Sequence, residues 1–405
     1  MHGATLLDAA GRVLRPCILW NDGRSALQCE ALTRGWPELR AVTGNLAMPG
    51  FTAPKLMWVR EHEPELFARV ASVLLPKAWL RWRLCGEKVE DLSDASGTLW
   101  LDVGRRAWSD AALAATGMRR EQMPRLAEGS EPVSELSPEW VRRWGFRRAP
   151  LLAGGAGDNA AGAVGVGAVR AGDAFVSLGT SGVLFVSNAR FMPNAARAVH
   201  AFCHAVPDAW HQMGVILSAT ASLEWLAGLL KTPAPKLTAA LGKSLSGPSP
   251  ALFLPYLSGE RTPVADAQIR GLIMGIGHET DARILTHAVL DGVAFAFRDS
   301  LEALKAAGTD VSRVMAVGGG TRSQLWLKII ATALDLPVDV PADGDFGGAF
   351  GAARLGLIAA TGADFKSVCT TPRIARTVKP EAKARAAYET AYGRYVQIYP
   401  SIREI

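Results

Sequence analysis

One segment near the C-terminus most constrains the fold of this chain. It contains an apolar strand at 314–317, three successive glycines at 318–320, a helix that Ser323 can cap and that runs through Leu334, and a second strand at 338–340. A strand, a glycine turn, a helix and a strand in this order are typical of a parallel sheet. We therefore predict an α/β protein, with the glycine turn at the carboxyl end of its strand, where such sheets bind ligands.

Two further glycine-rich segments follow one another closely. Residues 153–162 surround Asp158 and Asn159 with alanine and glycine, and residues 177–182 contain Gly179, Thr180 and Ser181 within an apolar run. Small residues let backbone N–H groups approach a ligand, and such groups bind phosphate. An aspartate beside a phosphate site can take the proton from a hydroxyl substrate, as kinases require.

The same residues also allow purely structural interpretations. Asp158 can simply cap a helix over 159–169. Residues 179–182 can be an ordinary turn between strands at 174–178 and 183–187. The glycines at 318–320 can either support a nucleotide or allow tight packing of strand and helix. The segments lack the lysine of a P-loop and the Gly-x-Ser-x-Gly pattern of a serine hydrolase.

Composition excludes several classes of protein. The chain has 405 residues, enough for two or three domains, and its formal charge is +6. The basic residues are scattered, and the densest group, within 142–148, is typical of a solvated helix end, so we expect an anionic small substrate and not nucleic acid. Five cysteines without Cys-x-x-Cys spacing predict a reducing, cytoplasmic location. We expect neither a membrane span nor a signal peptide.

The histidines at 200, 204 and 211, with Cys203, could form a zinc site. However, residues 199–202 have apolar neighbours and an extended pattern. Buried, hydrogen-bonded histidines are therefore the preferred interpretation.

Hydrophobic periodicity predicts the other elements. We expect a hairpin over 4–20, helices over 21–36, 51–70 and 281–306, and a small-residue helix that begins at 347 and packs closely against a neighbour.

Taken together, four segments resemble the FGGY carbohydrate kinases. Residues 50–62 fit the first signature of that family throughout. Residues 271–291 nearly fit the second, with Ile284 at a position that is polar in the family. Residues 19–24 and 256–263 are similar to two other family blocks. The similarity extends along nearly the whole chain.

The resemblance implies two actin-like domains, each with a ribonuclease-H-like sheet, around a cleft. The N-terminal, sugar-binding domain would comprise residues 1–170 and the C-terminal, nucleotide-binding domain residues 171–380. Residues 381–405 would form a helical tail. It also implies a cytoplasmic enzyme, which we predict can form a homodimer and binds neither nucleic acid nor membrane.

The activity implied by the resemblance is ATP-dependent phosphorylation of the 5-hydroxyl of D-xylulose, with Mg²⁺. Asp158 matches the catalytic base, and Met1, His2, Asp158 and Asn159 would contact the sugar. Gly179, Thr180 and Ser181 match the second phosphate loop of the family. The rest of the ATP site would be formed by Gly271, Gly318, Gly319, Gly320 and Arg322. The ligands of the metal stay open.

One family feature is missing, because no Asp-x-Gly-Thr turn occurs in the chain. In the family this first phosphate loop follows the first strand, and its aspartate helps to hold magnesium. We therefore expect an N-terminally truncated family member, with an incomplete first domain, an exposed apolar sheet edge and little activity. The alternatives are a related kinase for another ketose or polyol, and a non-catalytic sugar-binding remnant.

Overall fold

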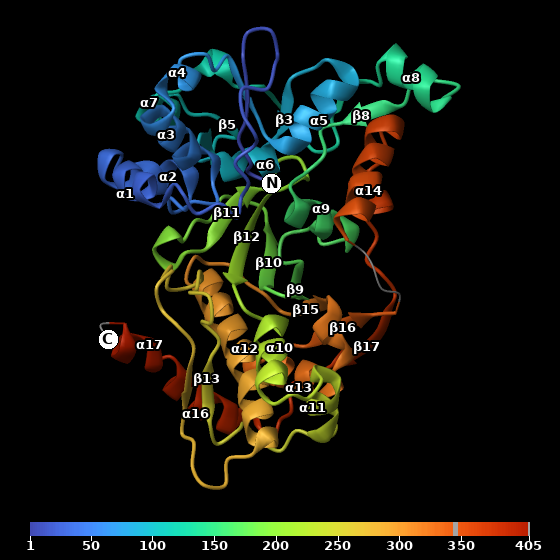
Figure 1. The fold of residues 1–405 in the computed structure, drawn as a ribbon. Coiled ribbons are helices and arrows are strands. Elements are labelled where there is room, and N and C mark those ends of the chain that lie inside the picture. Colours follow the sequence, from blue (N-terminus) through green and yellow to red (C-terminus); the bar gives the residue numbers. More distant parts are fainter. Residues whose placement is uncertain (343–346, 404–405) are drawn as a thin grey trace.

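A computed structural model describes residues 1–342 and 347–403 of the chain. In Figure 1 the first 150 residues form the upper part, and one large sheet with its covering helices forms the lower part. The two-part α/β architecture agrees with the expected fold class. Within the described residues, no helix is long and apolar enough to cross a membrane.

The upper part combines short helices with two-stranded sheets. Four strand pairs occur here: β1 (Thr5–Leu7) with β2 (Ser72–Leu74), β3 (Val89–Asp91) with β6 (Arg125–Ala127), β4 (Leu101–Asp102) with β5 (Ala107–Trp108), and β7 (Pro132–Glu135) with β8 (Leu151–Ala153). The helices are α1 (Ala26–Gly35), α2 (Leu39–Thr43), α3 (Thr52–His62), α4 (Pro64–Phe67), α5 (Pro76–Cys85), α6 (Leu92–Ala95), α7 (Asp110–Ala115) and α8 (Pro138–Trp144).

The expected hairpin over 4–20 is only partly correct. Its turn forms, with the Gly11 N–H donating to the Asp8 carbonyl at 2.9 Å. Its two arms meet only at two isolated bridges, Ala4 with Ile18 and Leu7 with Val13. Strand β1 instead pairs along its whole length with β2, a fully buried strand that lies more than sixty residues further along the chain.

The lower part is built on a seven-stranded sheet with the order β11-β12-β10-β9-β15-β16-β17. Its strands are β9 (Ala174–Leu178), β10 (Gly182–Asn188), β11 (His200–Cys203), β12 (Trp210–Ile216), β15 (Val314–Val317), β16 (Val338–Pro341) and β17 (Ile374–Val378). The predicted parallel pairing of β15 and β16 is confirmed, with Val314 opposite Val338. β15 is also parallel to β9, with Val317 opposite Ser177.

This parallel pair places two of the glycine segments side by side. The turn after β9 begins at Gly179, and the turn after β15 begins at Gly318, so both lie at the carboxyl ends of neighbouring strands. Gly318 has a φ of 95°, and a Cβ there would lie 2.8 Å from the Leu178 carbonyl oxygen. Close packing of the two turns therefore requires glycine at this position.

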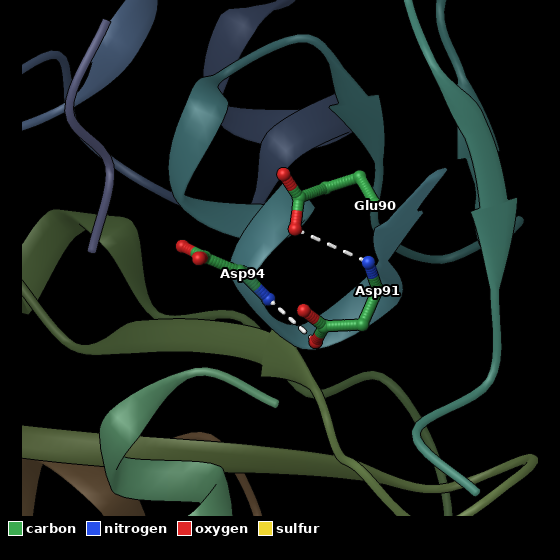
Figure 2. A group of neighbouring side chains, drawn as sticks. All are labelled: Glu90, Asp91 and Asp94. Atoms are coloured by element: carbon green, nitrogen blue, oxygen red, sulfur yellow. Dashed lines mark hydrogen bonds between the residues drawn. The ribbon is translucent and has the colours of Figure 1, made fainter. Parts of the chain in front are cut away.

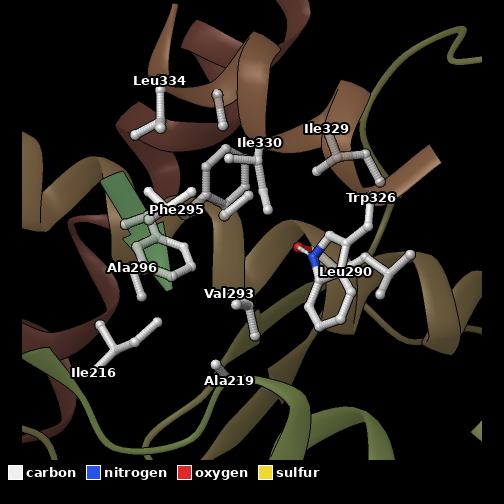
Figure 3. Packing of buried hydrophobic residues seen from close by; sticks show 14 of the residues in the cluster. Ile216, Ala219, Leu290, Val293, Phe295, Ala296, Trp326, Ile329, Ile330 and Leu334 are labelled. Atoms are coloured by element: carbon white, nitrogen blue, oxygen red, sulfur yellow. Dashed lines mark hydrogen bonds between the residues drawn. The ribbon is translucent and has the colours of Figure 1, made fainter. Parts of the chain in front are cut away.

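Helix α12 (Ala282–Lys305) forms the centre of the lower core. It begins where the Asp281 carboxylate accepts the N–H groups of Arg283 and Ile284, both at 2.9 Å. Figure 3 shows its apolar face packed against α13 (Gln324–Leu334), where the Trp326 indole donates to the Leu290 carbonyl at 3.1 Å. Ser323 caps α13 as expected, by accepting the Trp326 N–H. Burial of each large apolar side chain contributes about 1.5–3 kcal/mol to such a core.

Helix α14 (Gly348–Thr361) lies beside α9 (Asp158–Gly165), as Figure 1 shows. A Cβ at Gly351 would overlap the Ala161 carbonyl oxygen, so the expected close packing of this small-residue helix is confirmed. The capping interpretation of Asp158 is wrong, because Gly157 is the N-cap and Asp158 is already in the first turn. The helix also ends at Gly165, four residues earlier than expected.

The remaining elements cover the sheet or complete the C-terminus. They are α10 (Thr220–Leu229), α11 (Ala234–Ala240), β13 (Leu252–Leu254), β14 (Leu272–Met274), α15 (Phe365–Val368), α16 (Arg385–Tyr395) and α17 (Ile398–Ile402). The last long helix, α16, is fastened to α12 by two tyrosines. The Tyr388 hydroxyl donates to Asp291 at 2.6 Å, and the Tyr392 hydroxyl donates to Asp299 at 2.7 Å. The division into domains at 170 and 380 stays a prediction.

Candidate active site

A cavity of about 550 Å³ is lined by residues from both parts of the molecule, and we call it the cleft cavity. It brings together seven of the predicted site residues, which lie far apart in the sequence: Met1, His2, Asp158, Asn159, Gly179, Thr180 and Ser181. The predicted sugar contacts, the predicted base and the predicted phosphate turn therefore share one space. The other lining residues are Trp20, Met48, Gly50, Phe51, Ser177, Val183, His200, Phe202, Met213, Val215 and Arg261.

Asp158 is exposed at the start of α9 and forms no ion pair with any described residue. Its Oδ1 accepts two hydrogen bonds from Asn159, from the backbone N–H at 2.8 Å and from Nδ2 at 3.2 Å. Its Oδ2 has no hydrogen-bond partner among the residues that the structure describes. One oxygen is therefore oriented while the other is available to a proton from a ligand.

Contacts with the surrounding residues hold Met1 and His2 close to Asp158. The Asp158 N–H lies 3.4 Å from the Met1 sulfur. The His2 carbonyl accepts the Thr52 hydroxyl at 3.0 Å, and the His2 ring meets the rings of Phe51 and Phe202 edge-on. These contacts fix where the first two residues lie in the cavity.

Lys55 anchors the loop that forms one wall of the cleft cavity. Its side chain is fully buried, and its ammonium group donates to the carbonyls of Gly50 at 2.6 Å and Phe51 at 2.8 Å. Burial lowers the pKa of Lys55 to about 8. Because no described carboxylate pairs with this lysine, the two carbonyls stabilise its charge in place of water.

The turn over 179–182 is fixed from below by the start of α10. The carbonyl of Gly179 accepts both the backbone N–H and the hydroxyl of Thr220, each at 2.9 Å. The carbonyl of Thr180 accepts the N–H of Ala219 at 2.9 Å. Because its carbonyls are tied down in this way, the turn has a fixed shape, which a phosphate-binding turn would require.

A second cavity of about 580 Å³ begins on the other side of this turn, and we call it the glycine cavity. It is lined by Gly319, Gly320 and Arg322 together with Glu224 and Lys243. Thr220 also lines it, and Thr220 bonds to Gly179 in the wall of the cleft cavity. The two cavities are thus adjacent, as a nucleotide that spans both would require.

Two predicted nucleotide residues, Gly318 and Gly271, line neither cavity. Gly318 packs against Leu178 instead, so its role is close packing of the turn. Gly271 lies just before β14, where a Cβ would approach the Leu254 carbonyl oxygen at 3.2 Å, and it lines neither cavity.

Sequence reasoning missed Trp20 and Arg261 as cavity residues, although both lie in segments that carry the family resemblance. Arg261 is half-buried and forms no ion pair within the described part of the chain. Its backbone N–H donates to the Glu260 carboxylate at 2.7 Å, and the same oxygen accepts the Leu217 N–H at 2.9 Å. Burial raises the pKa of Glu260 to about 8.

The histidines form no metal site among the described residues. Their extended, buried setting is confirmed, because β11 begins at His200 and all three rings are nearly inaccessible. His200 lies 3.3 Å from Asn45 Oδ1, and His204 lies 3.2 Å from the Ser187 hydroxyl. His211 departs from the expectation, since neither of its ring nitrogens has a hydrogen-bond partner of ordinary geometry within the described chain.

Burial lowers the pKa of His200 to about 3 and that of His204 to about 4, and it places the pKa of His211 well below the ordinary value. All three are therefore neutral at physiological pH.

A buried acid cluster contacts His2 in the wall of the cleft cavity, and Figure 2 shows its three carboxylates where β3 leads into α6. Glu90, Asp91 and Asp94 are the one group of acidic, histidine or cysteine ligands close enough to hold a cation in the described chain. However, the Lys77 ammonium lies 2.7 Å from Glu90 and 2.5 Å from Asp91. Because this lysine already supplies the positive charge, the cluster does not fit a metal ion.

Comparison with known proteins identifies the family to which this chain belongs. Residues 1–165 match the N-terminal domain of the FGGY family of carbohydrate kinases, and residues 174–360 match the C-terminal domain. The chain therefore belongs to the FGGY family of carbohydrate kinases, which makes it a sugar kinase.

Several relatives in this family are named for one sugar. The chain is 47% identical over 407 residues to a xylulose kinase of Escherichia coli (strain K12), which covers 99% of this chain and 83% of that relative. It is 48% identical over 362 residues to a xylulose kinase of Klebsiella pneumoniae, covering 89% of this chain and 74% of the relative. A crystal structure described as a "xyloylose kinase" from Brucella ovis superposes with a TM-score of 0.97 at 56% identity, covering 100% of this chain and 83% of that one.

Proposed function

We propose that the chain phosphorylates D-xylulose to D-xylulose 5-phosphate at the expense of ATP. The convergence of Met1, His2, Asp158 and the 179–181 turn in one cavity is the observation that carries the proposal. The identity of 47–48% to xylulose kinases supports the choice of sugar.

In this mechanism Asp158 is the general base. The proton of the 5-hydroxyl moves to Asp158 Oδ2, and the freed oxygen forms a bond to the γ-phosphorus of ATP. The bond from that phosphorus to the β–γ bridging oxygen breaks at the same time, and ADP leaves. Asn159 holds the other oxygen of Asp158, so the reacting oxygen keeps its direction.

The nucleotide would lie across the two cavities. Its phosphates would meet the 179–181 turn, and its nucleoside would enter the glycine cavity beside Gly319, Gly320 and Arg322. Asp158 is the single carboxylate among the described residues that line the cleft cavity. Because Asp158 is also the proposed base, its free oxygen is not available to hold a metal ion, and Mg²⁺ would enter with ATP, bound chiefly by the substrate phosphates. When bound, the ion neutralises charge on those phosphates.

ADP release from the chain with MgATP and D-xylulose tests the proposal. We expect Asp158→Asn to lower kcat about 100-fold or more, because it removes the base and keeps the volume. Asp310→Asn is the matched control, since Asp310 is exposed and forms no ion pair with a described residue. A measurable kcat that is equal in wild type and Asp158→Asn would contradict the assignment of the base.

Little activity in the 405-residue chain stays a prediction, because it rests on the missing Asp-x-Gly-Thr turn. The same assay on a version extended upstream by the first phosphate loop tests it, together with thermal unfolding of both versions. Equal ADP release, midpoint and cooperativity in the two versions would contradict it.

The two alternative functions predict different results in the same assay. A kinase for another ketose or polyol would release ADP faster with that sugar in a substrate panel. A non-catalytic sugar-binding protein would bind D-xylulose without ADP release, and Asp158→Ala would leave binding unchanged.

We propose a cytoplasmic location on the basis of the cysteines, all five of which are unpaired. A homodimer is a further prediction, which light scattering of the purified chain tests by the molar mass.

A further inference from the structure

His2 has a backbone conformation that is unusual for a residue other than glycine. Its φ is 52°, in the left-handed region that non-glycine residues rarely adopt. Such a conformation persists where the surrounding structure imposes it, and it is concentrated at functional sites. The contacts that impose it on His2 therefore identify what holds this residue in the cleft cavity.

Asp94 makes two of those contacts through one oxygen. Its Oδ1 accepts the His2 backbone N–H at 3.3 Å and lies 3.1 Å from Nδ1 of the same residue. Thr52 holds the His2 carbonyl from the opposite side. The ring rests on Gly97, where any Cβ would overlap it. Backbone and ring of His2 are thus constrained together, and Asp94 contacts both.

The negative charge on Asp94 is itself stabilised by neighbouring groups. Burial of this fully inaccessible carboxyl opposes ionisation, but the His2 hydrogen bond and the Lys77 charge outweigh burial and lower the pKa of Asp94 below its ordinary value. Lys77 Nζ lies 4.0 Å from Asp94 Oδ2. An ionised Asp94 oxygen 3.1 Å from Nδ1 favours a proton on that nitrogen, although the angle is not that of an ordinary hydrogen bond, and Nε2 is the nitrogen left for a ligand.

We propose that Asp94 is a positioning residue for sugar binding, which fixes the orientation and the Nδ1–H tautomer of His2 so that Nε2 faces a hydroxyl group of the ketose. The inference rests on the proposed function, because it takes His2 to contact the sugar. In the neutral ring Nε2 accepts from a sugar hydroxyl, which is the bond that the wrong tautomer would lose.

Calorimetric titration with D-xylulose, without nucleotide, tests the proposal in wild type, Asp94→Ala, Asp94→Asn and His2→Ala. We expect about tenfold weaker binding in Asp94→Ala and a smaller loss in Asp94→Asn, whose amide oxygen can still accept from Nδ1, on the usual strength of a hydrogen bond to a charged group. The double variant His2→Ala/Asp94→Ala should bind no more weakly than His2→Ala alone, because Asp94 acts through His2.

Glu90→Gln is the matched control. Glu90 belongs to the same buried acid cluster and pairs with Lys77, but it does not touch His2. We expect its sugar affinity to stay within about twofold of wild type, a difference below the contribution of one net hydrogen bond. A loss in Glu90→Gln equal to that in Asp94→Ala would show that disturbance of the cluster, and not the contact with His2, weakens binding, and it would overturn the proposal.

The outcomes separate this inference from the proposed function. If His2→Ala weakens sugar binding and Asp94→Ala does not, the inference is wrong and the proposed sugar site stands. If His2→Ala has no effect, the predicted sugar contact itself is wrong. Should the Asp94 variants fail to fold, the ¹⁵N chemical shifts of His2 in the wild type decide. An Nδ1–H tautomer supports the proposal, and an Nε2–H tautomer overturns it.

Discussion

His211 is a buried polar residue without the hydrogen bonds that its sequence context led us to expect. Its ring stacks on Phe185 with centroids 4.5 Å apart and meets Phe202 edge-on. Its two nitrogens have no hydrogen-bond partner of ordinary geometry within the described chain, although the side chain is almost inaccessible. A buried polar atom without a partner costs free energy, so this ring serves the core as an aromatic group and not as a polar one.

We therefore expect His211→Phe to stabilise the protein by about 1–2 kcal/mol at neutral pH, because the stacked ring stays and the unpaired nitrogens are lost. Urea unfolding measures this change in the free energy of unfolding. His278→Phe, at an exposed position, is the control and should change it little. A lower stability of His211→Phe would show that a nitrogen of His211 has a partner, or that the larger ring does not fit.

At the scale of elements, helix packing positions the predicted base. Asp158 begins α9, and α14 packs against α9 at the contact between Ala161 and Gly351. The carbonyl of Asp158 is also near α14, since a Cβ at Gly348 would lie 3.5 Å from it. A shift of α14 would therefore be transmitted to the start of α9.

We expect Gly351→Ala to destabilise the protein by about 1–3 kcal/mol, the usual cost of overpacking, and to lower activity by moving α9. Gly356→Ala is the matched control in the same helix, because a Cβ there has nothing within 4 Å. This control should be neutral or stabilise by up to about 1 kcal/mol through its better helix propensity. Thermal unfolding of both variants measures the difference, and equal midpoints would contradict the packing argument.

Strands and helices of the lower part could be predicted from the sequence, because their hydrophobic periodicity depends on residues that are close together in the chain. Thus β9, β10, α12 and the unit from β15 to β16 occur where they were expected. The arms of the predicted hairpin around Gly11 depend on a distant strand, β2, and there the local pattern misleads. Asp158 likewise fits the sequence pattern of a cap, but the backbone makes Gly157 the N-cap.

For the whole molecule, buried titratable groups of both kinds predict a maximum of stability between acid and alkaline pH. The histidines at 200, 204 and 211 have folded pKa values below the unfolded value, so their contribution is lost as pH falls below about 6.5 toward 3. Burial raises the pKa of Glu260 to about 8 and that of Asp291 to about 6. The folded state therefore binds these protons more tightly, and stability falls as pH rises from about 4 through those values.

Glu260→Gln tests the alkaline limb of this profile, because glutamine keeps the uncharged form at every pH. We expect the fall in unfolding midpoint between pH 5 and 8 to be smaller in this variant than in wild type. The comparison uses melting curves at unit steps of pH, with His211→Phe as the variant for the acid limb. Parallel profiles for Glu260→Gln and wild type would show that Glu260 is ionised in the folded protein at neutral pH.

The amino-acid sequence by itself determined the α/β class, the parallel pair of strands on either side of the glycine turn at 318–320, and, through its resemblance to a family, seven of the residues that line the cleft cavity. These depend on local periodicity, on glycine where backbones approach closely, and on short motifs, all of which are written in consecutive residues. Only the tertiary structure decided that Trp20 and Arg261 share the cleft cavity, that Gly318 packs on Leu178, and that Asp94 holds His2 from 92 positions away. Such contacts join distant segments, and their energies depend on burial and on partners that no local pattern specifies.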